Sequence, residues 1–189
     1  MNTISIPPSF KVTEEQFQIL AIANRDIRLE LTSHGELIIM PPTGGNTGKS
    51  NAQLSAQFVI WNNQTKLGEV FDSSTAFRLP NGAKRSPDVS WVKIERWNEL
   101  TPEQQETFPP LYPDFVIEFR SRTDTMQSLR KKMQEYLDNG IRLGWLIDPK
   151  NRIVEIYQPQ QTVRILSAPK TLSGEDVLPG FSLNLETVW

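Results

Sequence analysis

The fold is decided by residues 114–149, which read DFVIEFRSRTDTMQSLRKKMQEYLDNGIRLGWLIDP. The two ends, DFVIEFR and LGWLIDP, are short apolar runs that are typical of strands. Between them, four apolar residues recur at helical spacing, Met126, Leu129, Met133 and Tyr136. The expected helix runs from Asp124 to Asn139 and ends at Gly140, a residue that readily adopts the left-handed conformation of a helix stop. This order of strand, helix and strand indicates an α/β domain.

The rest of the chain is predicted to contain further helices and strands. Thr13 and Gln16 form a capping box at the start of a short helix, and Thr101-Pro102-Glu103 predicts another helix start. KSNAQLSAQFVIWNNQ has the spacing of a further helix. Strands are expected in IRLELT, ELIIMPP, EVFDSSTAFRLP, SPDVSWVKI, RIVEIYQP and near the C-terminus. The chain is therefore predicted to be one mixed α/β domain over residues 1–189, with a loose arm at residues 1–12 and an N-terminal helix and hairpin.

Composition excludes several kinds of chemistry. The 189 residues include no cysteine and one histidine, and the net charge is −2. Disulfides, cysteine zinc sites and thiol nucleophiles are excluded. His34 lies in SHGE, which reads as an exposed turn between two strands. Any hydrolytic chemistry is therefore expected to depend on carboxylates and a hard cation. We also expect no signal peptide and no membrane span, and a cysteine-free chain fits the reducing cytoplasm.

Two carboxylates are candidates for that chemistry. In an extended DFVIEFR, Glu118 and Arg120 share one face of the strand, opposite the apolar face. They could form a surface ion pair, or Glu118 could bind a ligand. Asp88 begins the expected strand DVSWV, so sheet pairing could bring it beside Glu118. Asp114 is a poorer partner, because four residues at ~3.3 Å each separate it from Glu118 by ~13 Å along one strand.

Basic residues follow Glu118 closely. Residues 120–132 contain five cations against Asp124 alone, a local net charge of +4: Arg120, Arg122, Arg130, Lys131 and Lys132. Lys132 flanks the apolar stripe of the helix and could lean toward the sheet, or simply extend its amine to solvent. Such a patch can bind phosphates although the whole chain is mildly acidic.

At this point the chain resembles the bacterial proteins classed as restriction endonucleases of the Uma type, in the PD-(D/E)xK superfamily. The matching stretches are GELIIMPPTGG, VFDSSTAFRLPNGAKRSPDVSWV, YPDFVIEFRSRTD, KKMQEYLDNGIRLGWLIDP and SGEDVLPGF. The resemblance implies a restriction-endonuclease-like fold with a central mixed sheet flanked by helices. It also implies DNA hydrolysis with Mg²⁺ or Mn²⁺, and a homodimer is plausible because many members of the superfamily pair to cut two strands.

The resemblance also implies residue roles. Asp88 and Glu118 correspond to the metal-binding carboxylates, with the backbone carbonyl of Phe119 as a further ligand. Glu30 is the candidate for an additional acid on an early element. The superfamily lysine is replaced by Arg120, which stays protonated and cannot act as a general base. Lys132 is the alternative source of the amine, as the family places a lysine at this helical position.

The remaining expectations concern function. In the proposed reaction, Arg120 or Lys132 positions a water and offsets negative charge, while Arg122, Arg130 and Lys131 hold the DNA backbone. A catalytically inactive nuclease-like module that binds DNA or protein is the main alternative, because of the Arg120 replacement. A lesser alternative is a nucleotide hydrolase, since TGGNTGKS at residues 43–50 nearly matches a phosphate loop.

Overall fold

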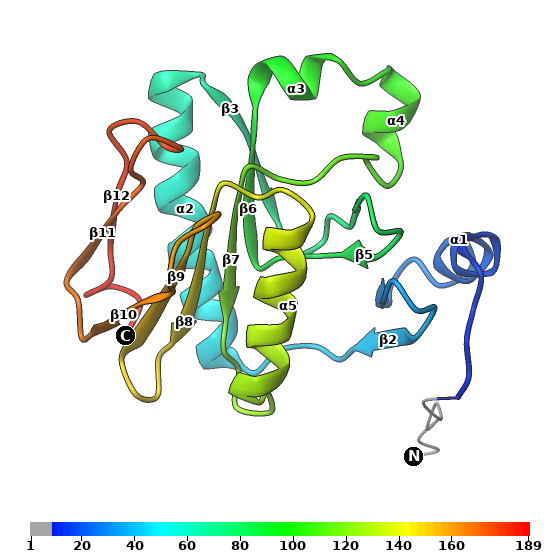
Figure 1. Ribbon diagram of the computed structural model, residues 1–189, viewed down its shortest axis with the longest axis horizontal. Helices are drawn as coiled ribbons and strands as arrows, with labels where there is room; N and C mark the ends of the chain where they lie inside the picture. The colour runs from blue at the N-terminus through cyan, green and yellow to red at the C-terminus, as the bar shows by residue number, and fades with distance from the viewer. Residues whose placement is uncertain (1–8) are drawn as a thin grey trace.

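A six-stranded mixed sheet forms the centre of the fold. The structure is a computed structural model that describes residues 9–189, and its central strands lie in the order β10-β9-β8-β7-β6-β3 (Figure 1). Their bounds are β3 Gly68–Asp72, β6 Val89–Lys93, β7 Phe115–Phe119, β8 Leu143–Asp148, β9 Ile153–Tyr157 and β10 Arg164–Ser167. β7 and β8 are parallel, and the other neighbouring pairs are antiparallel. The sequence prediction of a mixed α/β fold is confirmed.

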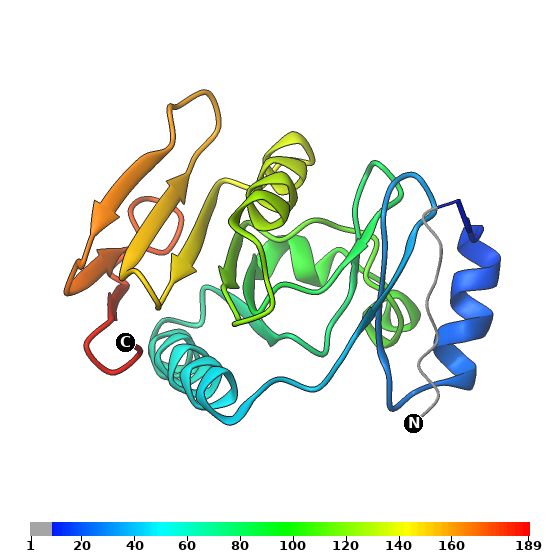
Figure 2. The same cartoon turned by 90° about the horizontal axis from the view of Figure 1, so that it is seen from below.

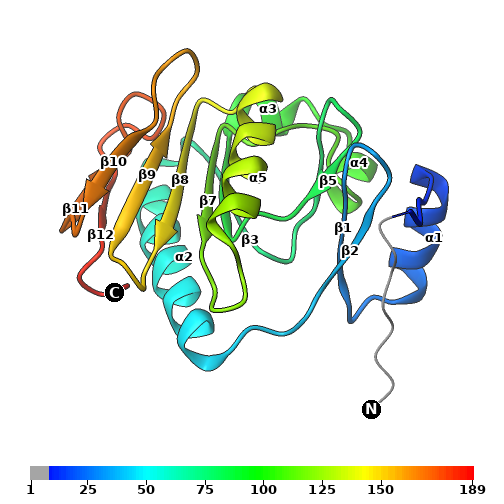
Figure 3. The ribbon, with the colours of Figure 1, turned by 60° about the horizontal axis from the view of Figure 1, so that its bottom comes forward.

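Two long helices cover opposite faces of this sheet (Figure 3). α2, Gly45–Thr65, buries Leu54, Phe58 and Trp61 against one face. α5, Met126–Asp138, buries Leu129, Met133 and Tyr136 against the other. Because side chains alternate along a strand, Ile117 points toward α2, whereas its neighbours Val116 and Glu118 lie on the α5 face. The Glu118 carboxylate of β7 therefore faces α5.

A second sheet lies beside the first, with strand order β2-β1-β5-β4. Its strands are β1 Arg28–Leu31, β2 Leu37–Met40, β4 Phe77–Arg78 and β5 Lys84–Arg85. α1, Glu14–Ala23, packs Phe17 against Leu31 of this sheet, at the end of the molecule opposite β10 (Figure 2). The predicted capping box of Thr13 and Gln16 is present.

Smaller elements complete the chain. They are the helices α3 Ile94–Asn98 and α4 Pro102–Glu106 and the strand pair β11 Thr171–Ser173 and β12 Ser182–Asn184. The predicted cap at Thr101 is confirmed as the start of α4. α3 and β10 were not predicted, and α2 begins at Gly45, before the predicted start at Lys49. Within residues 9–189, no helix has the length and apolar character needed to cross a membrane.

Two expected elements differ from the structure. EVFDSSTAFRLP, predicted as one strand, is divided between β3 and β4, which belong to different sheets. The break follows Asp72, whose Oδ1 accepts hydrogen bonds from the backbone N–H of Ser74 at 2.9 Å and from its hydroxyl. Of the arm predicted at residues 1–12, residues 1–8 lie outside the described part. Val12 is not loose, because it is buried and its N–H donates to the carbonyl of Gly35.

The strand predicted in SPDVSWVKI is also shorter in the structure, where β6 begins only at Val89. The chain leaves the smaller sheet after β5 and enters the central sheet at β6. Asp88 lies at this crossing, immediately before Val89. The break therefore places the first predicted metal ligand at the junction of the two sheets.

Candidate active site

Asp88 and Glu118 come together at the end of the β6–β7 pair. β6 and β7 are antiparallel and their register ends with Val89 opposite Ile117, so Asp88 and Glu118 are the residues next to the last paired positions. The N–H of Asp88 donates to the carbonyl of Ile117 at 3.0 Å, which holds Asp88 against β7. Both carboxylates line one open cleft, which has a volume of about 1150 Å³. The structure thus brings together two acids that are 30 positions apart in the chain.

Neutral donors hold the Asp88 carboxylate. Oδ1 accepts from Nδ2 of Asn51 at 3.0 Å, and Oδ2 accepts from the backbone N–H of Phe119 at 2.8 Å. Burial raises the pKa of Asp88, although both hydrogen bonds and the charge of Lys132 oppose that shift. The amide oxygen of Asn51 is buried and has no hydrogen-bond partner among the described residues. Asp88 is therefore fixed in orientation without being paired directly to a cation.

The Glu118 carboxyl is almost completely buried, with 4% of the residue exposed. Its Oε1 accepts from the Tyr136 hydroxyl at 2.9 Å and is 2.9 Å from Nζ of Lys132. Burial raises the pKa of Glu118 to about 7. Lys132 opposes this shift, and the negative charge of Asp88 adds to it. A shared cation would relieve the repulsion between the buried Glu118 and the partly buried Asp88.

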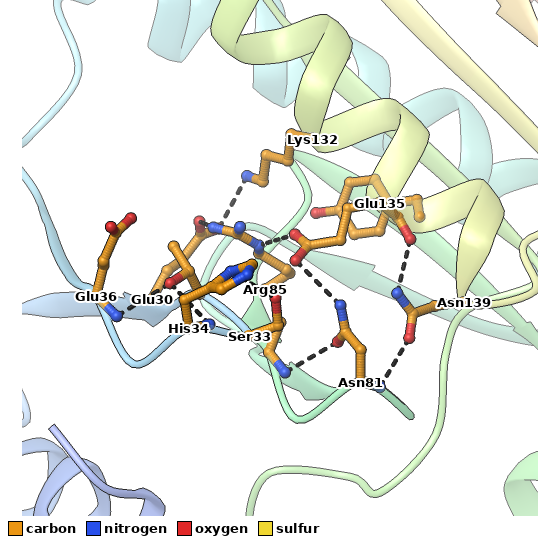
Figure 4. Close-up of polar contacts among 12 residues, drawn as sticks. Glu30, Ser33, His34, Glu36, Asn81, Arg85, Lys132, Glu135 and Asn139 are labelled. Atoms are coloured by element: carbon orange, nitrogen blue, oxygen red, sulfur yellow. Dashed lines mark hydrogen bonds and ion pairs between the residues drawn. The ribbon is translucent and has the colours of Figure 1, made fainter. Parts of the chain in front are cut away.

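Glu30 and Lys132 belong to the same cluster, as does Arg85, which the sequence did not single out (Figure 4). Nζ of Lys132 is 2.8 Å from Oε1 of Glu30, which also accepts the N–H of Ser86 at 2.8 Å. Nη1 of Arg85 is 3.1 Å from Oε2 of Glu30, and Nε of Arg85 is 2.5 Å from Oε2 of Glu135.

These contacts favour the charged forms of Glu30 and Lys132. Burial works against ionisation of Glu30, but the charges of Lys132 and Arg85 prevail and lower its pKa. Burial also works against the charged form of Lys132, and the carboxylates of Glu118 and Glu30 prevail and raise its pKa. Lys132 is therefore a fixed cation at the edge of the site.

Arg120 points to a different partner. Its Nη1 is 2.7 Å from Oδ2 of Asp148, and its Nε donates to the carbonyl of Asp124 at 3.3 Å. The pKa of Asp148 is lowered by hydrogen bonds from Asn151 and Arg120, although burial opposes this. The amine that contacts Glu118 comes from Lys132 on α5, not from the strand position where the superfamily motif has its lysine.

Of the three cations that the sequence analysis assigned to the DNA backbone, two line the cleft and one does not. Arg122 and Lys131 are exposed and line the cleft that contains Asp88 and Glu118. Arg130 forms a two-pronged pair with both oxygens of Glu155, with its Nε at 3.0 and 3.1 Å. Arg130 is thus engaged with β9.

Two other sequence hypotheses concern the rim of the cleft. Residues 45–50 form the first turns of α2, so the near match to a phosphate loop has no loop of the required length. His34 lies in the predicted turn between β1 and β2, is exposed, and has Nδ1 3.2 Å from the Ser33 hydroxyl (Figure 4). Neither feature supports a chemistry other than that of the carboxylates.

Sequence reasoning missed four residues of the site. Tyr136 and Glu135 lie four and three positions after Lys132, so helical periodicity placed them on its side of α5. Arg85 lies three residues before Asp88, in a short polar stretch that showed no periodic signal. Asn51 lies 37 positions before Asp88, and nothing in the sequence linked the two residues.

The donor set suits a small divalent cation. Among residues 9–189, no three His, Cys, Asp or Glu side chains cluster as metal ligands. Mg²⁺ does not require such a cluster, because it is commonly held by one or two carboxylates and retains several waters. Asp88 and Glu118 supply two carboxylates, and the unpartnered buried oxygen of Asn51 beside Asp88 is an acceptor suited to a bound water.

Comparisons with known proteins identify the fold and the family of this chain. A solved structure from Anabaena variabilis, described as "a putative nuclease belonging to DUF820", is similar with a TM-score of 0.78. The two chains are 20% identical, and the match covers 94% of this chain and 97% of that one, which shows the shared fold. No curated protein matches the sequence. The model of the family Uma2, described as "Putative restriction endonuclease", matches residues 14–186. The chain therefore belongs to the Uma2 family of restriction-endonuclease-like proteins.

Proposed function

We propose that this protein is a metal-dependent endonuclease that hydrolyses DNA phosphodiester bonds. Asp88 and Glu118 would hold one divalent ion, Mg²⁺ or Mn²⁺, and the backbone carbonyl of Phe119 would be a further ligand. The observation that carries the proposal is that two carboxylates, the buried Glu118 and the partly buried Asp88, come together at the end of the β6–β7 pair and line one open cleft. Membership of a family described as restriction endonucleases supports the same reaction class.

The bound ion supplies Lewis-acid stabilisation of the phosphate and lowers the pKa of a coordinated water. Lys132 contributes a fixed positive charge 2.9 Å from Glu118, which offsets negative charge on the reacting phosphate. Because its pKa is raised, Lys132 stays protonated near neutral pH and does not act as the general base. These contacts favour Lys132 over Arg120 for the role of the missing lysine.

Arg122 and Lys131 are the residues we assign to the DNA backbone, since both are exposed in the cleft. Their contribution is electrostatic and independent of sequence, so it should weaken as salt concentration rises. We further propose that the protein works in the cytoplasm, and that two copies cooperate when both strands of a duplex are cut.

Plasmid cleavage in Mg²⁺ or Mn²⁺ tests the proposal. Asp88→Ala and Glu118→Ala should abolish cleavage while circular dichroism shows an intact fold. Asp26→Ala is the matched control, because Asp26 is an exposed aspartate outside the cleft, and it should cleave at the wild-type rate. Full-rate cleavage by both site variants would contradict the proposal.

A second candidate is a nuclease-like module that binds DNA or protein without cutting. The observation that favours it is the engagement of Arg120, at the motif position of the lysine, with Asp148. Saturable DNA binding with no cleavage in either metal would support this alternative.

A further inference from the structure

Resting on the proposed function, we infer that each active site takes a single divalent ion, because the ammonium group of Lys132 fills the second cation position. Nuclease sites with two metals hold the ions about 3.5–4 Å apart, between shared carboxylates. Here Nζ of Lys132 lies between two carboxylates of different strands, 2.8 Å from Glu30 and 2.9 Å from Glu118. An ion that bridged these two acids would have to displace the ammonium.

Three donors already occupy the buried carboxylate of Glu30. Its Oε1 accepts Nζ of Lys132 and the N–H of Ser86, and its Oε2 accepts Nη1 of Arg85. The residue is 2% exposed, so an ion bound there would have to replace buried partners. Glu30 consequently acts as a positioning residue that holds Lys132, not as a ligand of the metal.

The carboxylates of Asp88 and Glu118 still have oxygen lone pairs that could bind a metal. Both hydrogen bonds to Glu118 reach Oε1, and its Oε2 accepts none from the described residues. Each oxygen of Asp88 has one neutral donor, and a carboxylate oxygen has a second lone pair. The oxygens best able to bind an ion are therefore those of Asp88 and Glu118.

Counting Mn²⁺ ions bound to the intact protein tests the inference. Calorimetric titration, checked by the electron paramagnetic resonance of free Mn²⁺, should give one ion per chain for wild type. Lys132→Met should raise the count to two, because it vacates the position between Glu30 and Glu118. Lys131→Met removes the same charge from the neighbouring exposed position and should leave the count at one.

The outcomes separate this inference from the proposed function. Two ions in wild type would overturn the inference, whatever the variants do, so the test holds even if Lys132→Met does not fold. One ion in a folded Lys132→Met, shown by circular dichroism, would overturn the assignment of Lys132 as the occupant. No bound ion in wild type, with no cleavage, would instead overturn the proposed function on which the inference rests.

Discussion

Replacing Glu118 by Gln should stabilise the metal-free protein, and only at neutral and higher pH. Burial is the main cause of the pKa of about 7 at Glu118, against an ordinary value of 4.5 for a glutamate. An acid whose pKa is higher in the folded state binds more protons when folded. The free energy of unfolding therefore falls as pH rises from about 4.5 through about 7. Below this window the carboxyl is neutral in both states and nothing is lost.

The size of the effect follows from that shift. A change from 4.5 to about 7, at about 1.36 kcal/mol per pKa unit, corresponds to about 3 kcal/mol lost above pH 7. Glutamine has the shape of the neutral acid and can still accept the Tyr136 hydroxyl. Lys132 keeps its ion pair with Glu30 in the variant. Glu118→Gln should thus be about 3 kcal/mol more stable than wild type at pH 8 and equal to it at pH 4.5.

Urea unfolding with a chelator present, at both pH values, measures this difference. At pH 8 it corresponds to a rise in Tm of about 6–12 °C for a domain of this size. Glu99→Gln is the matched control, because Glu99 is exposed and outside the cleft, and its stability should change little at either pH. The reasoning is refuted if Glu118→Gln is no more stable than wild type at pH 8, or equally stabilised at both pH values.

Three further predictions concern positioning and packing. Asn51→Ala removes the 3.0 Å hydrogen bond to Asp88, and should weaken Mn²⁺ affinity about 10-fold or more in a calorimetric titration; unchanged affinity would remove Asn51 from the site. Arg85→Met leaves the buried Glu30 and the partly exposed Glu135 short of a cation, and should lower the free energy of unfolding by about 3–5 kcal/mol in urea; wild-type stability would show that Lys132 alone suffices. Gly68→Ala would put a Cβ 2.3 Å from the backbone carbonyl of Val92, and should destabilise by at least about 1–3 kcal/mol. Gly44→Ala, with open space around its Cβ, is the control for that substitution and should unfold like wild type.

Local signals in the sequence predicted most of the fold. The predicted capping box at Thr13 and the predicted cap at Thr101, followed by Pro102, each mark an observed helix start, because these signals depend on residues within one helical turn. The division of EVFDSSTAFRLP between two sheets was missed, since both halves have strand-like composition. The choice of sheet depends on tertiary pairing, which local propensity does not record.

The candidate site shows the same division between local and long-range information. Alternation along DFVIEFR placed Glu118 on the opposite side of the strand from Phe115, Ile117 and Phe119. The sequence also predicted that sheet pairing would bring Asp88 near Glu118, and the pairing of β6 with β7 does so. Lys132 was named because of its place beside the apolar stripe of α5. Its bridging of two carboxylates could not be predicted, because Glu30 is 102 positions away and reaches it only through the packing of the second sheet.

The central claim is that Asp88 and Glu118 hold one cation between them, and crystals grown with Mn²⁺ test it most directly. Anomalous scattering from the metal should give a single peak within bonding distance of both carboxylates, with Lys132 still paired to Glu30. A bound ion located elsewhere, with these two carboxylates left as neighbours without a metal, would contradict the account.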